Sequence, residues 1–470
     1  MTQQYQLQCA LLQHGWENDV RVSVGADGRI ERIDHPAESG AAADAQRSGA
    51  ERVAGCVVPG IANAHSHAFQ RAMAGDTEFR ASARDSFWTW RQAMYALANR
   101  ITPADLTLLA TQLFIEMLKA GYTSVAEFHY LHRQPGGAPY PMAHGLWEAV
   151  DAAAARAGIA LTLLPTLYQA SDFGGQALKP EQARFALETD QFLRAIEARV
   201  QAERRAPSTT RTGAAFHSLR AVPLASLHAA VPALRSLDPA MPLHIHVAEQ
   251  LREVEACTAF SGRRPIELLL DTGLLDRHWC LVHATHAVGT ELEGIAASGA
   301  VVCLSISTEA NLGDGHFDAA RFLRLGGRIC VGSDSQATVC PAEELRWMEY
   351  QQRLRRKRRA VLATKAEPHV GTRLWREAAA QGAAATGQNA GEIAVGRRAD
   401  WLVLDDMHPS LAGARPESML DHLVFAGGSA AIRDVMVAGR WVVKDHRHEA
   451  EAALRGPFRD LLHRLALPGD

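Results

Sequence analysis

The chain has 470 residues, enough for one large domain with additions at its ends. Its hydrophobic fraction of 47% and charged fraction of 21% are ordinary for a globular protein with a sizeable core. The formal net charge of −3 argues against a nucleic-acid partner. The locally basic run 353–359 is interpreted as a solvated helix face.

The seven cysteines form no CxxC pair, and several lie in apolar runs, which is typical of reduced thiols packed in a protein core. Residues 1–16 lack a charged segment followed by a long apolar one, so no secretion signal is expected. No segment reaches about 18 uninterrupted apolar residues. We therefore expect a cytoplasmic protein that does not span a membrane.

Short apolar runs bounded by turns alternate with stretches rich in Ala, Leu, Glu and Arg. Strands that alternate with helices form parallel sheets, and eight such units close into a (β/α)8 TIM barrel. The eight predicted strands are 57–64, 124–128, 160–167, 214–219, 243–247, 280–284, 301–305 and 329–332.

The two ends of the chain differ from this central pattern. Residues 5–34 and 400–445 are expected to form short alternating strands, and neither set alone would make a stable sheet. We expect them to combine into a small β-sandwich beside the barrel. The predicted domains are 1–56, the N-terminal part of the sandwich, 57–390, the metal-dependent barrel, and 391–470, the C-terminal part of the sandwich with a terminal helix.

The strongest local signal for chemistry is the pair His65 and His67 at the end of the first predicted barrel strand. Residues i and i+2 of a strand point to the same side, so both imidazoles can face one metal ion. The carboxyl ends of the strands form the mouth where barrel active sites lie. An isolated His-x-His pair is a weak signal, and later strands must supply further ligands.

Three later strand ends carry such residues. His246 and Glu249 lie three residues apart at the end of the fifth strand, His283 ends the sixth, and Asp334 ends the eighth. His244 shares a face with His246 but lies one layer deeper, so we interpret it as a buried, hydrogen-bonded histidine. Nitrogen and oxygen donors of this kind suit zinc, and iron less specifically.

The order of these motifs resembles the amidohydrolase superfamily. The segments that carry the resemblance are His-Ser-His 65–67, His-Val-Ala-Glu 246–249, Val-His-Ala-Thr 282–285 and Gly-Ser-Asp-Ser 332–335, with flanks at 58–60 and 396–400. The resemblance implies a hydrolase with a barrel and a flanking sandwich. We find no lysine near the third or fourth strand, which favours a single metal ion per subunit.

Within the superfamily the chain resembles the formimidoylglutamate deiminases, on segments 65–75, 86–91, 126–130, 216–220 and 307–315. This resemblance implies the hydrolysis of N-formimidoyl-L-glutamate to N-formyl-L-glutamate and ammonia in histidine degradation. A homodimer is expected for this class. One position departs from the family pattern, because Gln336 stands where a histidine is expected after Asp334 and Ser335.

The resemblance also suggests roles for the residues. We expect His65, His67, His246 and Asp334 to hold zinc, which lowers the pKa of bound water. Asp334 and His283 would accept or orient the proton of that water, and His283 would stabilise the new oxygen. Glu249 would relay a proton to the leaving nitrogen.

Substrate recognition is expected to rest on charge, because arginine binds carboxylates in a bidentate manner. By resemblance, one carboxylate would be held by Arg220 and His217. The other would be held by Arg91, Gln70 and Tyr130.

Two other functions are compatible with the motifs. A deaminase of a cyclic amidine, such as a purine or pterin, would use the same metal centre with a flat aromatic slot. A catalytically inactive scaffold would be expected to lack some of the ligands or acid–base groups. Residues 71–101 form a long strand-to-helix connection, which predicts a mobile lid, a fixed cap or a dimer contact.

Overall fold

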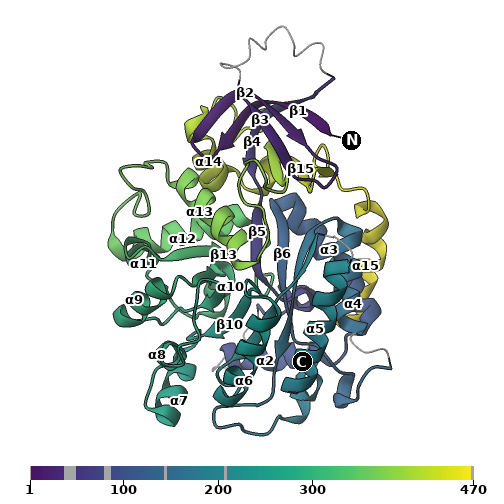
Figure 1. Ribbon diagram of the computed structural model, residues 1–470, viewed down its shortest axis with the longest axis vertical. Helices are drawn as coiled ribbons and strands as arrows, with labels where there is room; N and C mark the ends of the chain where they lie inside the picture. Colours follow the sequence, from purple (N-terminus) through teal and green to yellow (C-terminus); the bar gives the residue numbers. More distant parts are fainter. Residues whose placement is uncertain (1, 36–48, 79–85, 142–144, 206–208, 467–470) are drawn as a thin grey trace.

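The computed structural model describes residues 2–35, 49–78, 86–141, 145–205 and 209–466. Its centre is a ring of parallel strands, each hydrogen-bonded to the next in chain order (Figure 1). The strands are β5 (Ile61–Ser66), β6 (Tyr122–His129), β7 (Ala160–Leu167), β9 (Ala214–Ser218), β10 (Leu243–Val247), β11 (Trp279–His283), β12 (Val301–Leu304) and β13 (Arg328–Val331), with β8 (Thr210–Thr212) beside β7.

The ring closes between β5 and β13. Ser66 and Asp334 form a parallel bridge there, and the amide of Asp334 donates to the carbonyl of His65 at 3.0 Å. The amide of His67 donates in turn to the carbonyl of Asp334 at 3.1 Å. The predicted (β/α)8 barrel is confirmed, and its seam is formed by the predicted metal ligands themselves.

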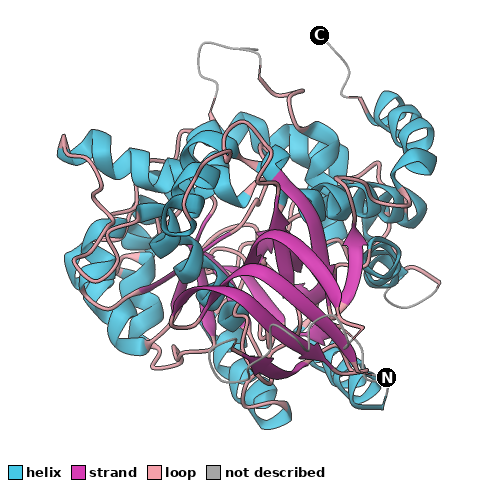
Figure 2. Ribbon diagram, turned by 90° about the horizontal axis from the view of Figure 1, so that it is seen from above, coloured by secondary structure: helices cyan, strands magenta, loops and turns pink. Residues whose placement is uncertain are grey.

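Helices surround the strands, as Figure 2 shows from above. They are α3 (Pro103–Ala120), α4 (Gly145–Ala157), α5 (Thr189–Arg205), α6 (Leu224–Leu237), α7 (Leu251–Ser261), α8 (Pro265–Asp271), α9 (Gly289–Ser298), α10 (Ile306–Leu312), α11 (Ala319–Arg324), α12 (Pro341–Arg356) and α13 (Val370–Ala385). Helix α3 shows why the sequence forms them. Thr102 and Asp105 make a capping box, and Gly121 ends the helix with a φ of 107°, a conformation that favours glycine. Among the described residues, none of the helices has the length and apolar character needed to cross a bilayer.

The two chain ends combine, as predicted, into a second sheet. Its hydrogen-bonded order is β16-β15-β14-β4-β1-β2-β3, so strands from the two ends meet at β14 and β4. Its strands are β1 (Gln3–Leu12), β2 (Gly15–Val24), β3 (Ile30–Asp34), β4 (Glu51–Pro59), β14 (Trp401–Leu404), β15 (Ile432–Val437) and β16 (Arg440–Val443). The rings of Trp401 and Tyr5 pack edge to face in its core, with their centroids 5.5 Å apart. Two further helices, α14 (Met419–His422) and the terminal α15 (Glu451–Leu465), follow β14 and β16.

The predicted strand 57–64 is wrong as a single element. In the structure β4 ends at Pro59 in the end sheet, and β5 starts at Ile61 in the barrel. The break falls at Gly60, where an added Cβ would lie 2.2 Å from the Thr123 side chain. The sequence did not indicate this change of sheet, because the end of β4 and all of β5 are buried and together give one continuous apolar run.

The connection 71–101 contains helix α2 (Phe87–Ala98), which begins at a capping box formed by Ser86 and Thr89. Figure 1 shows α2 and α7 toward the end of the barrel opposite the end sheet. Residues 79–85 of the predicted lid lie outside the described residues. The described part of the connection places an aromatic helix beside the mouth of the barrel.

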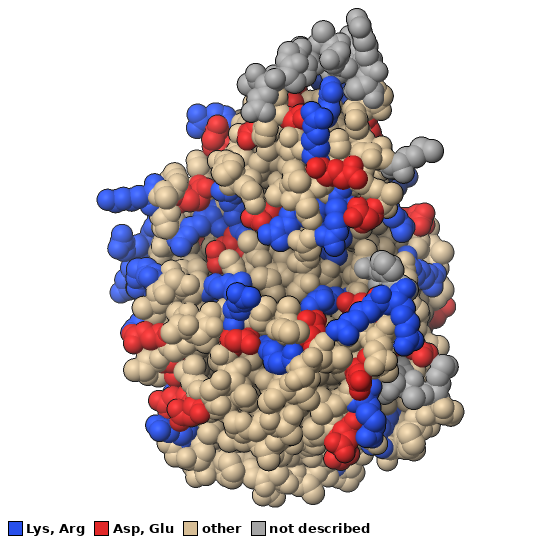
Figure 3. Space-filling view, in the orientation of Figure 1, with Lys and Arg blue, Asp and Glu red and all other residues tan. Residues whose placement is uncertain are grey.

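The basic run 353–359 lies at the end of α12. Arg353 pairs with Glu349 and Arg356 with Asp318, each at 2.6 Å. In the view of Figure 3, Lys and Arg side chains gather at the left edge of the molecule, and side chains of both charges are mixed over the rest of the surface in view. Arg355 and residues 357–359 are exposed, which agrees with the interpretation of the run as a solvated helix face.

Candidate metal centre and active site

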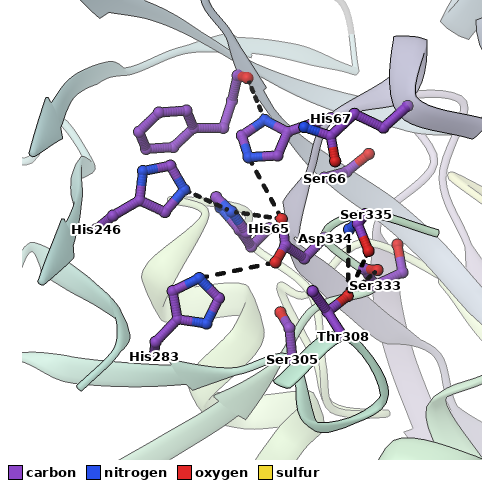
Figure 4. Close-up of polar contacts among 12 residues, drawn as sticks. His65, Ser66, His67, His246, His283, Ser305, Thr308, Ser333, Asp334 and Ser335 are labelled. Atoms are coloured by element: carbon purple, nitrogen blue, oxygen red, sulfur yellow. Dashed lines mark hydrogen bonds and ion pairs between the residues drawn. The ribbon is translucent and has the colours of Figure 1, made fainter. Parts of the chain in front are cut away.

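Four predicted metal ligands converge at the carboxyl ends of their strands (Figure 4). The Nε2 atoms of His65 and His246 lie 3.0 Å apart. Oδ1 of Asp334 lies 3.3 Å from Nε2 of His65 and 3.3 Å from Nε2 of His67. Ligands about 2.0–2.1 Å from a tetrahedral zinc ion are separated from one another by about 3.3 Å. The donor set therefore fits a single divalent metal ion.

Main-chain carbonyls orient two of these imidazoles. Nδ1 of His67 lies 2.8 Å from the carbonyl of Phe128, and Nδ1 of His246 lies 2.7 Å from that of His217. A proton on Nδ1 leaves Nε2 free to bind metal. Burial lowers the pKa of both His67 and His246, so they stay neutral, the form that ligates.

The backbone at these strand ends is turned into the left-handed region. The φ angles are +51° at Ala248, +68° at His283, +45° at Asp334 and +66° at Gln336. Residues with side chains rarely adopt such angles, and they occur where the surrounding structure demands them. Here the turned backbone carries the acid–base residues at the mouth of the barrel.

The three predicted catalytic residues form one buried cluster. Nε2 of His283 lies 3.8 Å from Oε1 of Glu249 and 3.7 Å from Oδ2 of Asp334. Burial lowers the pKa of His283, but the surrounding carboxylates outweigh it and raise the value to about 10. Burial raises the pKa of Glu249 to about 7. The cluster can therefore both hold and release a proton near neutral pH.

All five predicted substrate residues line a single cavity together with the acid–base cluster and three of the four candidate metal ligands, His67, His246 and Asp334. The five are Gln70, Arg91, Tyr130, His217 and Arg220. The amide of Gln70 donates to the hydroxyl of Tyr130 at 2.9 Å, so these two partners already touch. Within the described part of the chain, neither arginine forms an ion pair. Two guanidinium groups without an ion pair among the described residues, both lining the cavity beside the metal ligands, make it suited to anions.

Aromatic side chains that were not predicted from the sequence form one wall of this cavity. Tyr95 comes from α2, Tyr168 directly follows β7, and Phe185 ends the short 3-10 helix η3 (Pro180–Phe185). The amide of Gln182 donates to the hydroxyls of both tyrosines, at 3.2 Å and 2.8 Å. The position of Tyr168 directly after a predicted strand was a usable signal. Phe185 gave none, because the short 3-10 helix that carries it has no motif.

Two buried glutamates that the sequence analysis did not single out hold the strand ends in place. Glu127 accepts from the Ser66 hydroxyl at 2.7 Å and from the amide of Ala68 at 2.6 Å. Glu253 accepts from the amides of Ala248 and Glu249, at 3.2 Å and 3.1 Å. Glu127 lies within the segment 126–130 that carries the family resemblance, so its position was a signal.

Gln336, the departure from the family pattern, supports the metal ligands from behind. Its amide donates to the carbonyl of Asp334 at 2.6 Å and to the Ser66 hydroxyl at 3.1 Å. The hydroxyl of Ser333 donates to its carbonyl oxygen at 2.7 Å. The interpretation of His244 is confirmed, because its ring is buried and Nε2 lies 2.8 Å from the carbonyl of Ala385.

Comparison with known proteins agrees with this geometry. The pattern of the amidohydrolase family matches residues 56–442, and that of the N-terminal domain of formimidoylglutamate deiminase HutF matches residues 8–48. A formimidoylglutamate deiminase from Pseudomonas aeruginosa is 48% identical over 456 residues, covering 97% of this chain and 98% of the relative.

Solved structures give the same result for the fold. An amidohydrolase from Brucella melitensis has a TM-score of 0.90 and 39% identity, over 99% of this chain and 100% of that one. An adenosine deaminase from Xanthomonas campestris with bound zinc shares the fold alone, with a TM-score of 0.80 and 20% identity over 98% of each chain. The chain thus belongs to the amidohydrolase family and, within it, to the formimidoylglutamate deiminases.

Proposed function

We propose that this protein is a zinc hydrolase that converts N-formimidoyl-L-glutamate and water into N-formyl-L-glutamate and ammonia. The observation that carries the proposal is the single cavity that joins the candidate metal ligands to Arg91 and Arg220. A substrate with two carboxylates and an amidine matches both parts of this cavity. The 48% identity to a formimidoylglutamate deiminase supports the same substrate.

His65, His67, His246 and Asp334 would hold one zinc ion per subunit. When bound there, zinc would supply a water molecule whose pKa is near neutral. Three imidazole nitrogens and one carboxylate oxygen are donors that zinc accepts in catalytic sites. Iron could occupy the same set of donors and is the lesser alternative.

The acid–base residues would move protons during the reaction. Asp334 accepts the proton of the attacking water, and His283 orients that water and stabilises the new oxygen. Glu249 delivers a proton to the nitrogen that leaves. The carbon gains a C–O bond and loses a C–N bond, and both protons of the water end on the departing ammonium. A positioned acid–base group contributes about 10²–10⁴-fold to the rate.

The carboxylates would be bound by two groups of residues. Arg220 and His217 hold one carboxylate, and Arg91, Gln70 and Tyr130 hold the other. Arginine presents two parallel donors to a carboxylate, which fixes its orientation as well as its charge. The two arginines therefore set the position of the amidine carbon relative to the metal ligands.

A deaminase of a cyclic amidine is the second candidate. The aromatic wall formed by Tyr95, Tyr168 and Phe185 is the observation in its favour. The unpaired arginines favour a dicarboxylate instead, since a neutral base would leave them without a partner. An inactive scaffold is disfavoured because the ligands and the acid–base cluster meet in one cavity. A cytoplasmic homodimer acting in histidine degradation completes the proposal.

The test is to incubate zinc-loaded protein with N-formimidoyl-L-glutamate and measure ammonia and the organic product by mass spectrometry. We expect equal amounts of ammonia and N-formyl-L-glutamate, and no reaction with Asp334→Asn. Formamide and glutamate would show that the wrong bond was assigned. Turnover of purine or pterin substrates alone would establish the second candidate.

A further inference from the structure

Trp88, on helix α2, lies among three guanidinium groups. The Cζ atoms of Arg91 and Arg252 each lie 4.4 Å from the centre of its ring, and that of Arg220 lies at 5.9 Å. A cation within about 6 Å of a ring face is attracted by the negative charge of that face. One indole therefore contacts three positive charges.

None of the three guanidinium groups forms an ion pair in the described part of the chain. Burial lowers the pKa of Arg220, but Glu253 and Glu249 outweigh this effect and raise it. Like charges this close repel one another, and Arg220 contributes to a lowered pKa of Arg91, after the larger effect of burial. The Nε atoms of Arg91 and Arg220 are buried without a hydrogen-bond partner. Among the described residues, the face of Trp88 is a favourable contact that all three arginines share.

The indole also joins three separate segments of the chain. Arg91 shares α2 with Trp88, Arg220 follows β9, and Arg252 lies in the first turn of α7, three residues after Glu249. Of the described residues, Arg91 and Arg220 line the cavity, whereas Trp88 and Arg252 are outside its lining. Trp88 therefore contacts the two inner arginines without lining the cavity itself.

We propose that Trp88 is a positioning residue that holds the guanidinium groups of Arg91 and Arg220 for the carboxylates, and that Arg252 clamps the indole from outside. This rests on the proposed function, since it assigns the two inner arginines to a dicarboxylate. An arginine held in its binding conformation before the ligand arrives loses less freedom on binding. The indole thus raises affinity for dicarboxylates without contacting them.

Substitutions at Trp88 distinguish a role of the aromatic ring face from a role of the side chain in packing alone. Trp88→Leu removes the face and should weaken binding of a dicarboxylate by about 5- to 30-fold. Trp88→Phe keeps a ring face and should restore affinity to within about threefold. Arg252→Met, at an exposed position, should weaken binding by about 2- to 10-fold. Arg263→Met is the matched control, because that exposed arginine pairs with Asp271 at 3.1 Å.

The experiment measures the Kd of N-formyl-L-glutamate and N-formyl-L-glutamine by calorimetry on zinc-loaded protein. We expect the preference for the dicarboxylate to shrink in Trp88→Leu and Arg252→Met, with metal content and thermal stability kept. Equal losses in Trp88→Leu and Trp88→Phe, or none in Trp88→Leu and Arg252→Met, would overturn the proposal. So would a wild type that fails to bind the dicarboxylate.

Turnover of N-formimidoyl-L-glutamate is measured in parallel. We expect the variants to raise KM far more than they lower kcat. A wild type that binds the dicarboxylate with the expected pattern of variants but releases no ammonia would contradict the proposed reaction and support the positioning role. Failure of the reaction and failure of the inference therefore give different results.

Discussion

Nδ1 of His283 lies 3.2 Å from Oε1 of Glu309, a carboxylate from helix α10. The same oxygen accepts from the amide of Ser305 at 3.1 Å, which fixes it at the end of β12. This contact orients the imidazole so that Nε2 faces Glu249 and Asp334. A carboxylate behind a histidine of this kind sets both its orientation and its proton affinity.

Glu309→Gln should therefore move the pH dependence of catalysis. Burial lowers the pKa of His283, while Glu249, Glu309 and Asp334 raise it to about 10, so removing one carboxylate lowers it. If protonated His283 stabilises the new oxygen, activity is lost as pH rises through its pKa. We expect the alkaline limit of kcat/KM to shift to lower pH and kcat to fall about tenfold. An unshifted profile, equal to that of the exposed control Glu293→Gln, would contradict this role.

The two histidines of β10 should behave differently when replaced. His246→Ala removes a candidate ligand and should cost both bound metal and activity. His244→Gln should keep the metal, because the native ring bonds to the carbonyl of Ala385 one layer deeper. Metal content by mass spectrometry, together with kcat, distinguishes them. Loss of metal from the His244 variant alone would reverse the assignment.

Arg220→Met should weaken substrate binding. A hydrogen-bonded pair with a charged partner contributes about 1.5–3 kcal/mol, so kcat/KM should fall about 10- to 150-fold. Arg91→Met should act in the same direction on the second carboxylate. Steady-state kinetics with N-formimidoyl-L-glutamate provide the test, with Arg263→Met as the control. Kinetic parameters of Arg220→Met equal to those of the wild type would show that Arg220 does not bind the substrate.

Gln336→Ala should loosen the metal centre without changing substrate selectivity. The side chain donates hydrogen bonds to Ser66, at the end of β5, and to the carbonyl of Asp334, after β13. Its loss therefore removes one link between the two strands where the barrel closes. Removing a partner of this kind typically costs 10- to 100-fold in metal affinity or activity. Competition with a chelator measures the affinity, and Gln201→Ala, at an exposed position of α5, is the control. Altered preference among substrates at unchanged metal affinity would contradict the prediction.

Glu344 should make the stability of the fold depend on pH. Burial raises its pKa to about 8, against 4.5 for a free side chain, although Ser307 donates to it from both its amide and its hydroxyl. The folded state then holds the proton more tightly than the unfolded state. Its contribution to stability is complete below pH 4.5 and is lost as pH rises toward 8.

Glu344→Gln should abolish this loss, which is on the order of 2–4 kcal/mol between pH 5 and pH 8. Denaturant unfolding of wild type and variant at both pH values gives the difference. The neighbouring Glu343→Gln serves as the control. If the free energy of unfolding of the wild type, relative to that of the variant, rose between pH 5 and pH 8, the prediction would be contradicted.

The sequence by itself determined the barrel and most of the candidate site. Periodic apolar runs specify strands and helices because burial follows the repeat of each element. His65, His67, His246, His283 and Asp334 were predictable because carboxyl ends of parallel strands meet at one mouth. Their positions needed only the strand boundaries.

Only the tertiary structure decided what surrounds those residues. The split at Gly60 depends on contact with Thr123, and the placement of Arg252 on Trp88 depends on how α7 meets α2. Such contacts join segments far apart in sequence and leave no local pattern of hydrophobicity or spacing. The same holds for Glu309 behind His283, whose effect on proton affinity arises from a distance of 3.2 Å that no spacing along the chain encodes.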